Sequence, residues 1–260
     1  MKAHRKIAIV TGGASGVGAA AARLLAGSGH DVLINYKRSA DLARVLVADC
    51  EAAGADAIAV QGDVADDAVC RELVDAAKAR WGRLDSLVNS AGATRFVPMP
   101  DLEGVNAADF QTIFGVNAIG PFQMARAASK LMGKSGAIVN VSSIAGQTGS
   151  GSSFPYVLSK AALNALTLGL ARTLAPNIRV NAVLPGMIEG RWMRGGLGDE
   201  AYERVKAQFS ATSLLGRIST PEQIAAAVVW LLDPNCLMTG QLMVVDAGFT
   251  LGRPPPSTGA

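Results

Sequence analysis

Short, continuous apolar segments alternate along the chain with longer segments that are rich in alanine and leucine. The apolar segments lack the strict alternation of a half-exposed strand, and such continuous runs are typical of parallel strands covered on both faces. We therefore expect seven buried strands, at residues 7–10, 32–35, 57–60, 86–89, 137–141, 179–184 and 242–245.

Between the strands, apolar residues recur at helical spacing. This pattern predicts helices near residues 16–27, 40–53, 66–80, 121–133, 156–174 and 221–232. A strand followed by a helix, repeated with right-handed crossovers, predicts a doubly wound α/β fold of three layers, with a parallel seven-stranded sheet of the Rossmann type. The length of 260 residues and the hydrophobic fraction of 50% suit one domain, which we place at residues 1–250.

Residues 186–220 interrupt this pattern and contain one predicted helix, from Glu200 to Phe209. A long insertion after the carboxyl end of a strand often forms a lid over a ligand site, and we expect a lid here. Its apolar side chains suit a hydrophobic or aromatic ketone, or contacts with a neighbouring subunit. These side chains are Met187, Trp192, Met193 and Leu197.

Composition and charge argue against several classes of function. The formal net charge is +3 without any dense run of Lys and Arg, so neither a nucleic acid nor an anionic membrane is an expected partner. Two histidines and three cysteines without a CxxC spacing argue against structural zinc, a disulfide framework and a Ser-His-Asp hydrolase, and we predict no metal site. No apolar run reaches the roughly 18 residues of a membrane span, so a cytoplasmic protein is the simplest interpretation. The proline-rich residues 251–260 predict an extended or disordered tail.

The first predicted strand leads into the glycine-rich sequence TGGASGVG at residues 11–18. Glycines let backbone N–H groups approach a pyrophosphate, and the N-terminus of the next helix adds about half a positive charge there. Glycine also serves turn geometry alone, but a position in the first βα turn of a parallel sheet favours nucleotide binding. The expected contacts are Gly12, Ser15, Gly16, Val17 and Gly18.

The second predicted strand ends in the sequence Asn35, Tyr36, Lys37 and Arg38, without a carboxylate. An NAD-binding protein of this fold usually has an acidic residue here, whereas a guanidinium pairs well with the 2′-phosphate of NADP. The segment therefore favours NADP(H), with NAD(H) possible, unless Lys37 and Arg38 only begin a solvated turn. After the third strand, Asp63 either contacts the adenine of the cofactor or caps the following helix.

Eight short motifs occur along the chain in a characteristic order. They are TGGASGVG, GDV (62–64), NSAG (89–92), VNAIG (116–120), NVSS (140–143), YVLSK (156–160), RVNAVLPG (179–186) and GQLMVVDAG (240–248). In this order the sequence resembles the classical short-chain dehydrogenases/reductases from Ile7 to Gly248, most of all their 3-oxoacyl-(acyl-carrier-protein) reductase-like branch.

The resemblance implies hydride transfer between a nicotinamide and a ketone or secondary alcohol. Four positions match the family's catalytic tetrad: Tyr156 as the proton donor, Lys160 as the activating lysine that also holds the nicotinamide ribose, Ser143 as the serine that binds the substrate oxygen, and Asn117 as the holder of a proton-relay water. Ser143 is chosen over Ser142 because it has the family's spacing to Tyr156. Further implied cofactor contacts are Asp63, Val64, Asn89, Ala91, Gly92, Pro185, Gly186 and Ile188.

Elementary chemistry supports the Tyr156–Lys160 pair independently. Four residues apart on a helix, the two side chains lie on one face. Reduction of a ketone leaves charge on oxygen and needs a proton donor, but a free phenol has a pKa of about 10. We expect the Lys160 ammonium to lower the pKa of Tyr156 towards the range in which acid–base catalysis is most effective. Singly, each tetrad residue also fits an ordinary structural role, whereas together they favour catalysis.

The chain departs from the family pattern at two positions. Ser90 stands where a second asparagine is common, and Gly190 stands where many relatives have a threonine that contacts the carboxamide of the nicotinamide. We expect the backbone of Ile188 to take over that contact.

The expected partners are a small ketone or alcohol and further copies of the chain, as a homotetramer or homodimer that uses the helix at 160–175. Lys130, Lys134 and Arg172 either dock an acidic acyl-carrier protein or form a solvated face. Two alternatives are an NAD-dependent alcohol, sugar or steroid dehydrogenase of the same family and a non-catalytic module that senses NADP(H).

Overall fold

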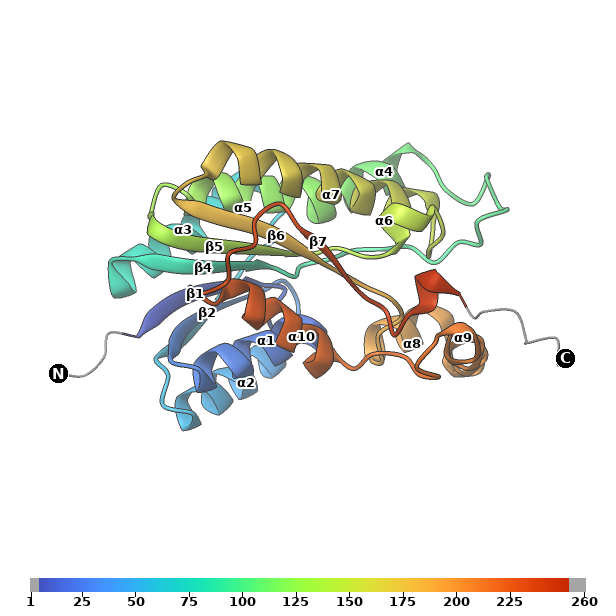
Figure 1. Cartoon of the computed structure of the whole chain (residues 1–260), viewed down its shortest axis with the longest axis horizontal. Coiled ribbons are helices and arrows are strands. Elements are labelled where there is room, and N and C mark those ends of the chain that lie inside the picture. Colours follow the sequence, from blue (N-terminus) through green and yellow to red (C-terminus); the bar gives the residue numbers. More distant parts are fainter. Residues whose placement is uncertain (1–4, 253–260) are drawn as a thin grey trace, which may run out of the picture.

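A computed structural model describes residues 5–252 and contains one seven-stranded parallel sheet between two layers of helices (Figure 1). The strands lie in the order β3-β2-β1-β4-β5-β6-β7, so the direction of winding reverses between β1 and β4. The predicted α/β fold of Rossmann type is confirmed. The strands are β1 (Lys6–Thr11), β2 (His30–Tyr36), β3 (Ala57–Gln61), β4 (Leu84–Asn89), β5 (Met132–Val141), β6 (Ile178–Pro185) and β7 (Leu242–Val245).

Helices α1, α2 and α10 cover one face of the sheet, and α3, α4, α5 and α7 cover the other (Figure 1). Short α6 follows β5, while α8 and α9 form the insertion after β6. The bounds are α1 (Gly16–Gly27), α2 (Ala40–Ala52), α3 (Asp67–Trp81), α4 (Ala107–Phe114), α5 (Gly120–Ala128), α6 (Ala145–Thr148), α7 (Phe154–Leu174), α8 (Arg191–Leu197), α9 (Asp199–Thr212) and α10 (Pro221–Leu232).

The helix predicted near residues 121–133 was wrong at its carboxyl end. Helix α5 ends at Ala128, and Met132 already belongs to β5, where it pairs with Leu84. The apolar pattern continued past the helix because Leu131 and Met132 also pack in the core, as part of the approach to the strand. Helix α4 was not predicted.

The start of α4 has a signal that the sequence prediction did not use. Asn106 is its N-cap, and the Asn106 side chain accepts hydrogen bonds from the N–H groups of Ala108 and Asp109. The Asp109 carboxylate accepts in return from the N–H of Asn106, which completes a capping box. A π-helix, η1 (Gly115–Ile119), joins α4 to α5.

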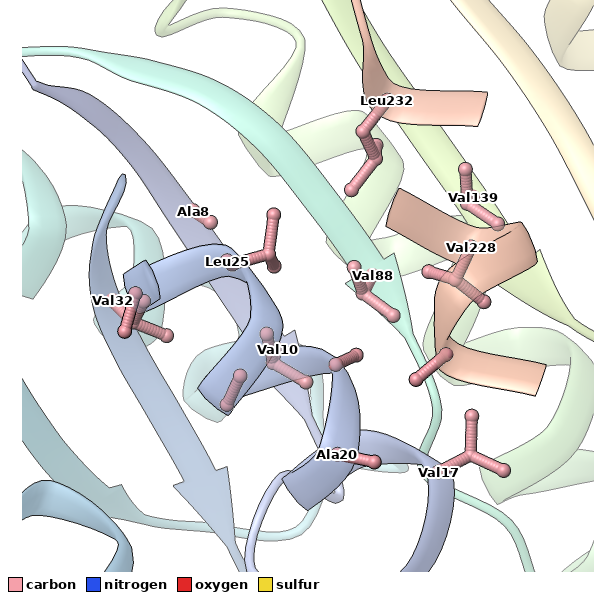
Figure 2. Packing of buried hydrophobic residues seen from close by; sticks show 14 of the residues in the cluster. Ala8, Val10, Val17, Ala20, Leu25, Val32, Val88, Val139, Val228 and Leu232 are labelled. Atoms are coloured by element: carbon pink, nitrogen blue, oxygen red, sulfur yellow. The ribbon is translucent and has the colours of Figure 1, made fainter. Parts of the chain in front are cut away.

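Small side chains let α1 pack closely on the sheet. In Figure 2, Val10, Val32, Val88 and Val139 of the strands face α1 and α10, and Leu25 of α1 lies among them. Residues 19–22 of α1 are all alanines and all buried. This packing fixes the N-terminus of α1 beside the carboxyl end of β1.

The prediction that all strands are buried was wrong for the two edge strands. Val244 of β7 is 39% exposed, and the other three residues of β7 are half-buried. Residues of β3 are also half-buried for the most part. Each of these strands pairs with one neighbour among the residues that the structure describes, so its second edge lies outside the sheet.

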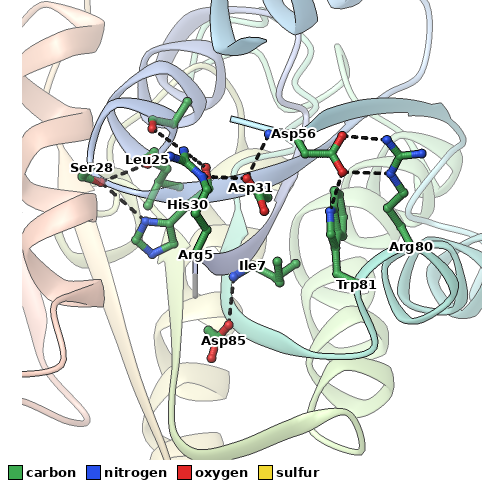
Figure 3. A network of polar contacts seen from close by, with 11 residues as sticks. Arg5, Ile7, Leu25, Ser28, His30, Asp31, Asp56, Arg80, Trp81 and Asp85 are labelled. Atoms are coloured by element: carbon green, nitrogen blue, oxygen red, sulfur yellow. Dashed lines mark hydrogen bonds and ion pairs between the residues drawn. The ribbon is translucent and has the colours of Figure 1, made fainter. Parts of the chain in front are cut away.

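A polar network holds the opposite, amino edge of the sheet together (Figure 3). The Asp31 carboxylate at the start of β2 accepts hydrogen bonds from Arg5 Nε (2.7 Å) and from the N–H of Asp56 (2.9 Å). The Asp56 carboxylate in turn accepts from Arg80 and from Trp81 Nε1 of α3. The Arg80 hydrogen bonds lower the pKa of Asp56 below its ordinary value. The starts of β1, β2 and β3 and the end of α3 are thus linked on the side away from the candidate site.

Within residues 5–252, no helix combines the length and apolar character needed to cross a membrane. Over the same residues, no three His, Cys, Asp or Glu side chains gather closely enough to bind a metal ion. Apart from Leu251 and Gly252, the tail predicted at residues 251–260 lies outside the described residues.

Candidate active site

The predicted site residues all lie at the carboxyl edge of the sheet or in the helices next to it. The loop after β1 meets the loop after β4, where the winding of the sheet reverses. Gly12 has a φ of +60°, and a β-carbon there would lie 2.6 Å from the Cα of Ala91. Only glycine permits this contact, and a crevice at the reversal point is where ligands bind in this architecture.

The glycine-rich loop has the features of a cradle for a pyrophosphate. A β-carbon on Gly18 would lie 2.6 Å from the carbonyl oxygen of Gly12, so this glycine closes the loop against α1. A β-carbon on Gly16, in contrast, would meet no atom within 4 Å. Ser15 is exposed at the N-cap of α1 and makes no capping hydrogen bond, and the first turn of α1 has no acidic residue. The predicted contacts at Ser15, Gly16 and Val17 therefore suit an anion at the helix N-terminus.

Asn35 holds three loops together. Its side chain accepts from the N–H of Gly12 (3.4 Å) and donates to the carbonyl of Gly62 (3.0 Å), while its backbone carbonyl accepts from the N–H of Gly13 (2.8 Å). The side chain is only 2% exposed. We therefore assign Asn35 a role in shaping the cofactor loops.

At the tips of β2 and β3, Lys37 and Asp63 form an ion pair. Partial burial opposes ionisation of Asp63, but the hydrogen bonds from Lys37 and from the N–H of Ala65 prevail and lower the pKa of Asp63. The proposed capping role of Asp63 was wrong, because α3 is capped by Asp66, which accepts from the N–H of Ala68 (2.9 Å). Arg38 is exposed and forms no ion pair with any residue from 5 to 252.

Tyr156, Lys160 and Ser143 come together where α7 begins beside the end of β5. Lys160 Nζ lies 5.7 Å from the centroid of the Tyr156 ring and donates to the carbonyl of Val141 (2.8 Å). Tyr156 is 9% and Lys160 is 4% exposed. The Ser143 hydroxyl lies close enough to Tyr156 to affect its pKa, and it accepts from the N–H of Ala145 (3.1 Å).

The expectation that the pKa of Tyr156 lies below that of a free phenol was wrong for this structure. Burial raises the pKa of Tyr156 to about 12, and the nearby Ser143 hydroxyl offsets only part of this rise. Burial also lowers the pKa of Lys160, to about 8. Desolvation dominates because both groups are enclosed and the lysine points towards the Val141 carbonyl. At neutral pH the phenol therefore holds its proton.

The side chain of Asn117 is committed to hydrogen bonds within the protein. It is fully buried in the π-helix η1, and its oxygen accepts from the N–H of Ala93 (2.7 Å). Its two N–H groups donate to the carbonyl of Ala93 (2.9 Å) and to the hydroxyl of Ser159 (3.0 Å). Ser159 in turn donates to the carbonyl of Tyr156 (2.7 Å). Asn117 and Ser159 thus position the first turn of α7, and any water bound by Asn117 has to be held by its backbone.

Ser159 was missed by the sequence analysis although it lies within the YVLSK motif. Its signal was a serine three residues after Tyr156, on the inward face of the helix. Gly146 was also missed. A β-carbon there would lie 2.6 Å from the backbone carbonyl carbon of Lys160, so only a glycine lets α6 pack this closely against α7. Ser142 is buried and donates to Asn164 Oδ1 (2.7 Å), whereas Ser143 is half-buried beside Tyr156.

Hydrogen bonds from the end of β4 and the loop after it link this segment to β1 and β5. The N–H groups of Ser90 and Ala91 donate to Thr11 Oγ1, and Thr11 is a further residue that the prediction missed. The Asn89 amide donates to Asn140 Oδ1 (2.9 Å), while Asn89 Oδ1 is buried without a hydrogen-bond partner among the described residues. Gly92 is exposed beyond them.

After β6, the backbone conformation of the chain explains why residue 190 is a glycine and not a threonine. Ile188 bridges Ser219, and the two hydrogen bonds of this bridge are made by the N–H of Glu189 and the carbonyl of Met187. The N–H of Ile188 therefore points away from Ser219, as the predicted contact requires. Gly190 has a φ of +148°, which a threonine would adopt only with strain.

Two other predicted contacts frame this turn. Pro185 is the last residue of β6, and Gly186 lies so close to Asp246 that a β-carbon would approach the Asp246 β-carbon to 2.9 Å. Val64 is buried, and its carbonyl accepts from the Gln123 amide (3.1 Å).

The insertion after β6 forms two helices, of which α8 was not predicted. Its sequence RWMRGGL contains two glycines, which have a low helix propensity. The helix is therefore stabilised by tertiary contacts. Most of the lid's apolar side chains do not face the site, contrary to expectation: Met187, Met193 and Leu197 pack with Tyr202 and Ile218 in a small core. Trp192 alone of that group lies against Tyr156, with ring centroids 6.0 Å apart.

Comparison with known proteins gives consistent matches over nearly the whole chain. A family model described as enoyl-(acyl carrier protein) reductase matches residues 12–250. A protein assigned by its name as a ketoacyl reductase of the granaticin polyketide synthase of Streptomyces violaceoruber is 40% identical over 250 residues, covering 94% of this chain and 96% of the relative.

Solved structures agree with these matches. A structure from Burkholderia xenovorans, assigned to the short-chain dehydrogenases/reductases, is 38% identical with a TM-score of 0.87 and covers 96% of this chain and 100% of its own. A short-chain dehydrogenase from Burkholderia cenocepacia in complex with NADP is 33% identical with a TM-score of 0.86, covering 94% and 98% of the two chains.

The burial of Lys160 predicts a pH-dependent contribution to stability. The pKa of Lys160 is about 8 in the folded protein, against an ordinary lysine value of 10.5 that we take for the unfolded chain. Between these values the unfolded chain binds one more proton, so the free energy of unfolding rises with pH. The unfolding free energy of the wild type minus that of Lys160→Met should therefore rise by up to about 3 kcal/mol between pH 8 and 10.5 and stay flat below pH 8.

Urea unfolding at a series of pH values measures this difference. Lys130→Met, at an exposed lysine, controls for the loss of one positive charge. A difference that does not change between pH 8 and 10.5 would show that Lys160 is not desolvated as the structure indicates.

Proposed function

Because the chain belongs to the short-chain dehydrogenase/reductase family, whose members act on alcohol and carbonyl groups with a nicotinamide cofactor, we propose that it is an NADPH-dependent reductase of ketones. The observation that carries the proposal is the buried Tyr156 beside Ser143 and Lys160. A phenol with a pKa of about 12 is fully protonated at neutral pH. Reduction needs the protonated phenol, whereas oxidation of an alcohol begins with the phenolate acting as a base.

The proposed mechanism uses three side chains around the substrate oxygen. A nicotinamide cofactor held by the glycine-rich loop and Lys160 would supply a hydride to the carbonyl carbon, and negative charge would then develop on the carbonyl oxygen. Tyr156 transfers its proton to this oxygen, because an alkoxide is a stronger base than a phenolate. The N–H of Ala145 occupies one lone pair of Ser143, so the Ser143 hydroxyl is oriented to donate its own hydrogen to the same oxygen.

Lys160 stabilises the phenolate that remains after proton transfer. Its pKa of about 8 leaves it mostly protonated at neutral pH. An ammonium at 5.7 Å from the ring centroid favours the anionic ring over the neutral one. Proton transfer to the substrate is thereby assisted at the step where charge appears on Tyr156.

We assign the cofactor preference to NADP(H) on the basis of Arg38. Lys37 is already paired with Asp63, so Arg38 is the exposed cation at the tip of β2 that is available to a 2′-phosphate. A guanidinium binds a phosphate in a bidentate manner. The related Burkholderia cenocepacia protein in complex with NADP supports the same assignment.

Two alternatives are weaker. An NAD-dependent dehydrogenase would favour an acid at the tip of β2, and Asp63 near this position is neutralised by Lys37. A non-catalytic sensor of NADP(H) would have no use for a buried Tyr156–Lys160 pair, since Lys160 is costly to bury.

We also propose that the protein is a homotetramer. One exposed apolar surface consists of Ile119, Phe122 and Leu158, which are 43–49% exposed on neighbouring η1, α5 and α7. A second is the open edge of β7 with Val244. Two separate surfaces of this kind suit a closed tetramer, in which each surface packs against the same surface of another copy about a twofold axis.

Arg172, one of the three basic residues considered for an acyl-carrier protein, does not lie near the reacting groups. Arg172 is in the last turn of α7 and Tyr156 in the first, which places them roughly 24 Å apart along the helix. The structure therefore gives this docking surface no further support, although a ketone carried on a thioester remains a useful test substrate.

Tyr156→Phe should retain the affinity for NADPH and lose turnover by at least about a hundredfold, because the ring stays in place while the proton donor is removed. Fluorescence titration measures the first quantity, and NADPH oxidation with a panel of ketones measures the second. Undiminished turnover in this variant would exclude Tyr156 as the proton donor.

Arg38→Asp should shift the ratio of the dissociation constants of NADH and NADPH towards NADH by about tenfold or more, because the carboxylate repels the 2′-phosphate. Arg44→Asp is the matched control, since Arg44 is an exposed arginine of α2. If both variants kept the wild-type ratio, Arg38 would not be the phosphate contact.

Light scattering coupled to gel filtration should give the mass of four chains. Leu158→Glu should reduce this mass, since it places a charge in one of the two apolar surfaces. A wild-type mass of one chain would contradict the proposed assembly.

A further inference from the structure

Two aromatic side chains from separate segments meet beside the proton donor. Trp192 lies on α8 of the lid, and Phe96 lies on the loop between β4 and α4. The Trp192 ring is 6.0 Å from the Tyr156 ring at an interplanar angle of 53°, and 6.2 Å from the Phe96 ring in an edge-on arrangement at 64°. We call Phe96 and Trp192 the aromatic wall.

A glycine in α8 holds the aromatic wall together. Gly196 lies one helical turn after Trp192, and a β-carbon there would overlap the ring of Phe96. Helix α8 thus touches Phe96 at two successive turns of the same face. Close contact at this point requires glycine, although glycine disfavours a helix.

The loop that carries Phe96 is fastened to the segment before α7. The N–H of Val97 donates to the carbonyl of Ser152 (2.8 Å), and the hydroxyls of Thr94 and Ser152 are 2.6 Å apart. Phe96 therefore has a fixed position relative to the first turn of α7. The aromatic wall is built from the lid on one side and from the body of the domain on the other.

The surroundings of Tyr156 are apolar apart from Ser143 and Lys160. Ala145, Val157 and Met99 pack around its ring. Arg95 forms an ion pair with Asp109 of α4, and Arg194 forms ion pairs with Asp199 and Glu203 of α9. Arg191 is exposed at the first position of α8.

We propose that the substrate is a ketone that carries an aromatic ring, or an equally flat apolar group, next to its carbonyl, and that Trp192 and Phe96 select for this group. Trp192 is 52% exposed, so about half of the indole is open to a ligand while the rest lies against Tyr156 and Phe96. A carbonyl oxygen that reaches the Tyr156 hydroxyl brings the adjoining group against this open half. Flat rings gain more from such a contact than flexible alkyl chains do.

This inference rests on the proposed ketone reduction and narrows its substrate class. Acetophenone and 2-octanone have equal numbers of carbon atoms and make a suitable pair of probes. In Trp192→Ala, kcat/KM for acetophenone should fall by about tenfold or more, mainly through KM, while kcat/KM for 2-octanone changes by less than about threefold. The affinity for NADPH should not change.

Trp230→Ala is the matched control, because Trp230 is also 52% exposed but lies on α10, which covers the face of the sheet opposite to α7 and Tyr156 (Figure 1). It should leave both values of kcat/KM unchanged. An equal loss for the two ketones in Trp192→Ala would overturn the inference, as would an equal loss in both tryptophan variants.

A double-mutant cycle tests the contact between the two halves of the wall. Gly196→Ala should lower kcat/KM for acetophenone, because the added methyl group pushes α8 away from Phe96. In the Phe96→Ala background the same substitution should have little further effect, since the obstructing ring is gone. Equal effects of Gly196→Ala in both backgrounds would contradict the proposed contact.

The outcomes separate this inference from the proposed function. If the wild type has equal kcat/KM for both ketones and Trp192→Ala changes both values by the same factor, the proposed ketone reduction stands and the aromatic preference is excluded. If the wild type oxidises NADPH with no ketone, including an acetoacetyl thioester, the proposed function fails and the inference fails with it.

Discussion

The enclosure of Tyr156 and Lys160 in one apolar corner is the constraint on which the rest of the site depends. Burial disfavours the charged form of each group, so it lowers the pKa of the lysine and raises that of the tyrosine. The Tyr156 phenol therefore keeps its proton at neutral pH. The Lys160 ammonium stabilises the phenolate once Tyr156 has given up that proton. Ser142, Gly146 and Ser159 hold α7 in place around this pair, and none of them needs to contact the substrate.

The parallel sheet explains why the pair can serve a cofactor at all. All carboxyl ends of the strands lie at one edge of the sheet, so the glycine-rich loop and the tip of β2 lie at the same edge as the end of β5, beside which α7 begins. The ion pairs of Asp31 and Asp56 fasten the opposite edge (Figure 3). Because the amino edge stabilises the fold, the carboxyl edge tolerates glycines with a positive φ. It also tolerates an insertion as long as the lid.

The sequence was sufficient to predict the fold, and most candidate site residues lie at the carboxyl edge of the sheet, as the motif order implies. Continuous apolar runs marked all seven strands, and the bounds predicted for α1 and α10 agree with the structure, because both depend on local periodicity. Helix α8 could not be predicted, since tertiary contacts at Gly196 and Trp192 outweigh the low helix propensity of its glycines. The pKa of Tyr156 was also beyond prediction, because the four-residue spacing to Lys160 shows proximity but not the extent of desolvation or the direction of the lysine towards Val141.

The most direct measurement is a spectroscopic titration of Tyr156 in the cofactor-free protein. The ultraviolet difference between the wild type and Tyr156→Phe isolates the ionisation of this phenol from that of Tyr36 and Tyr202. The account predicts no phenolate signal from Tyr156 through about pH 10, since its pKa is about 12. A phenolate signal from Tyr156 that appears between pH 7 and 8 would contradict the desolvation of this phenol, on which the account of the site depends.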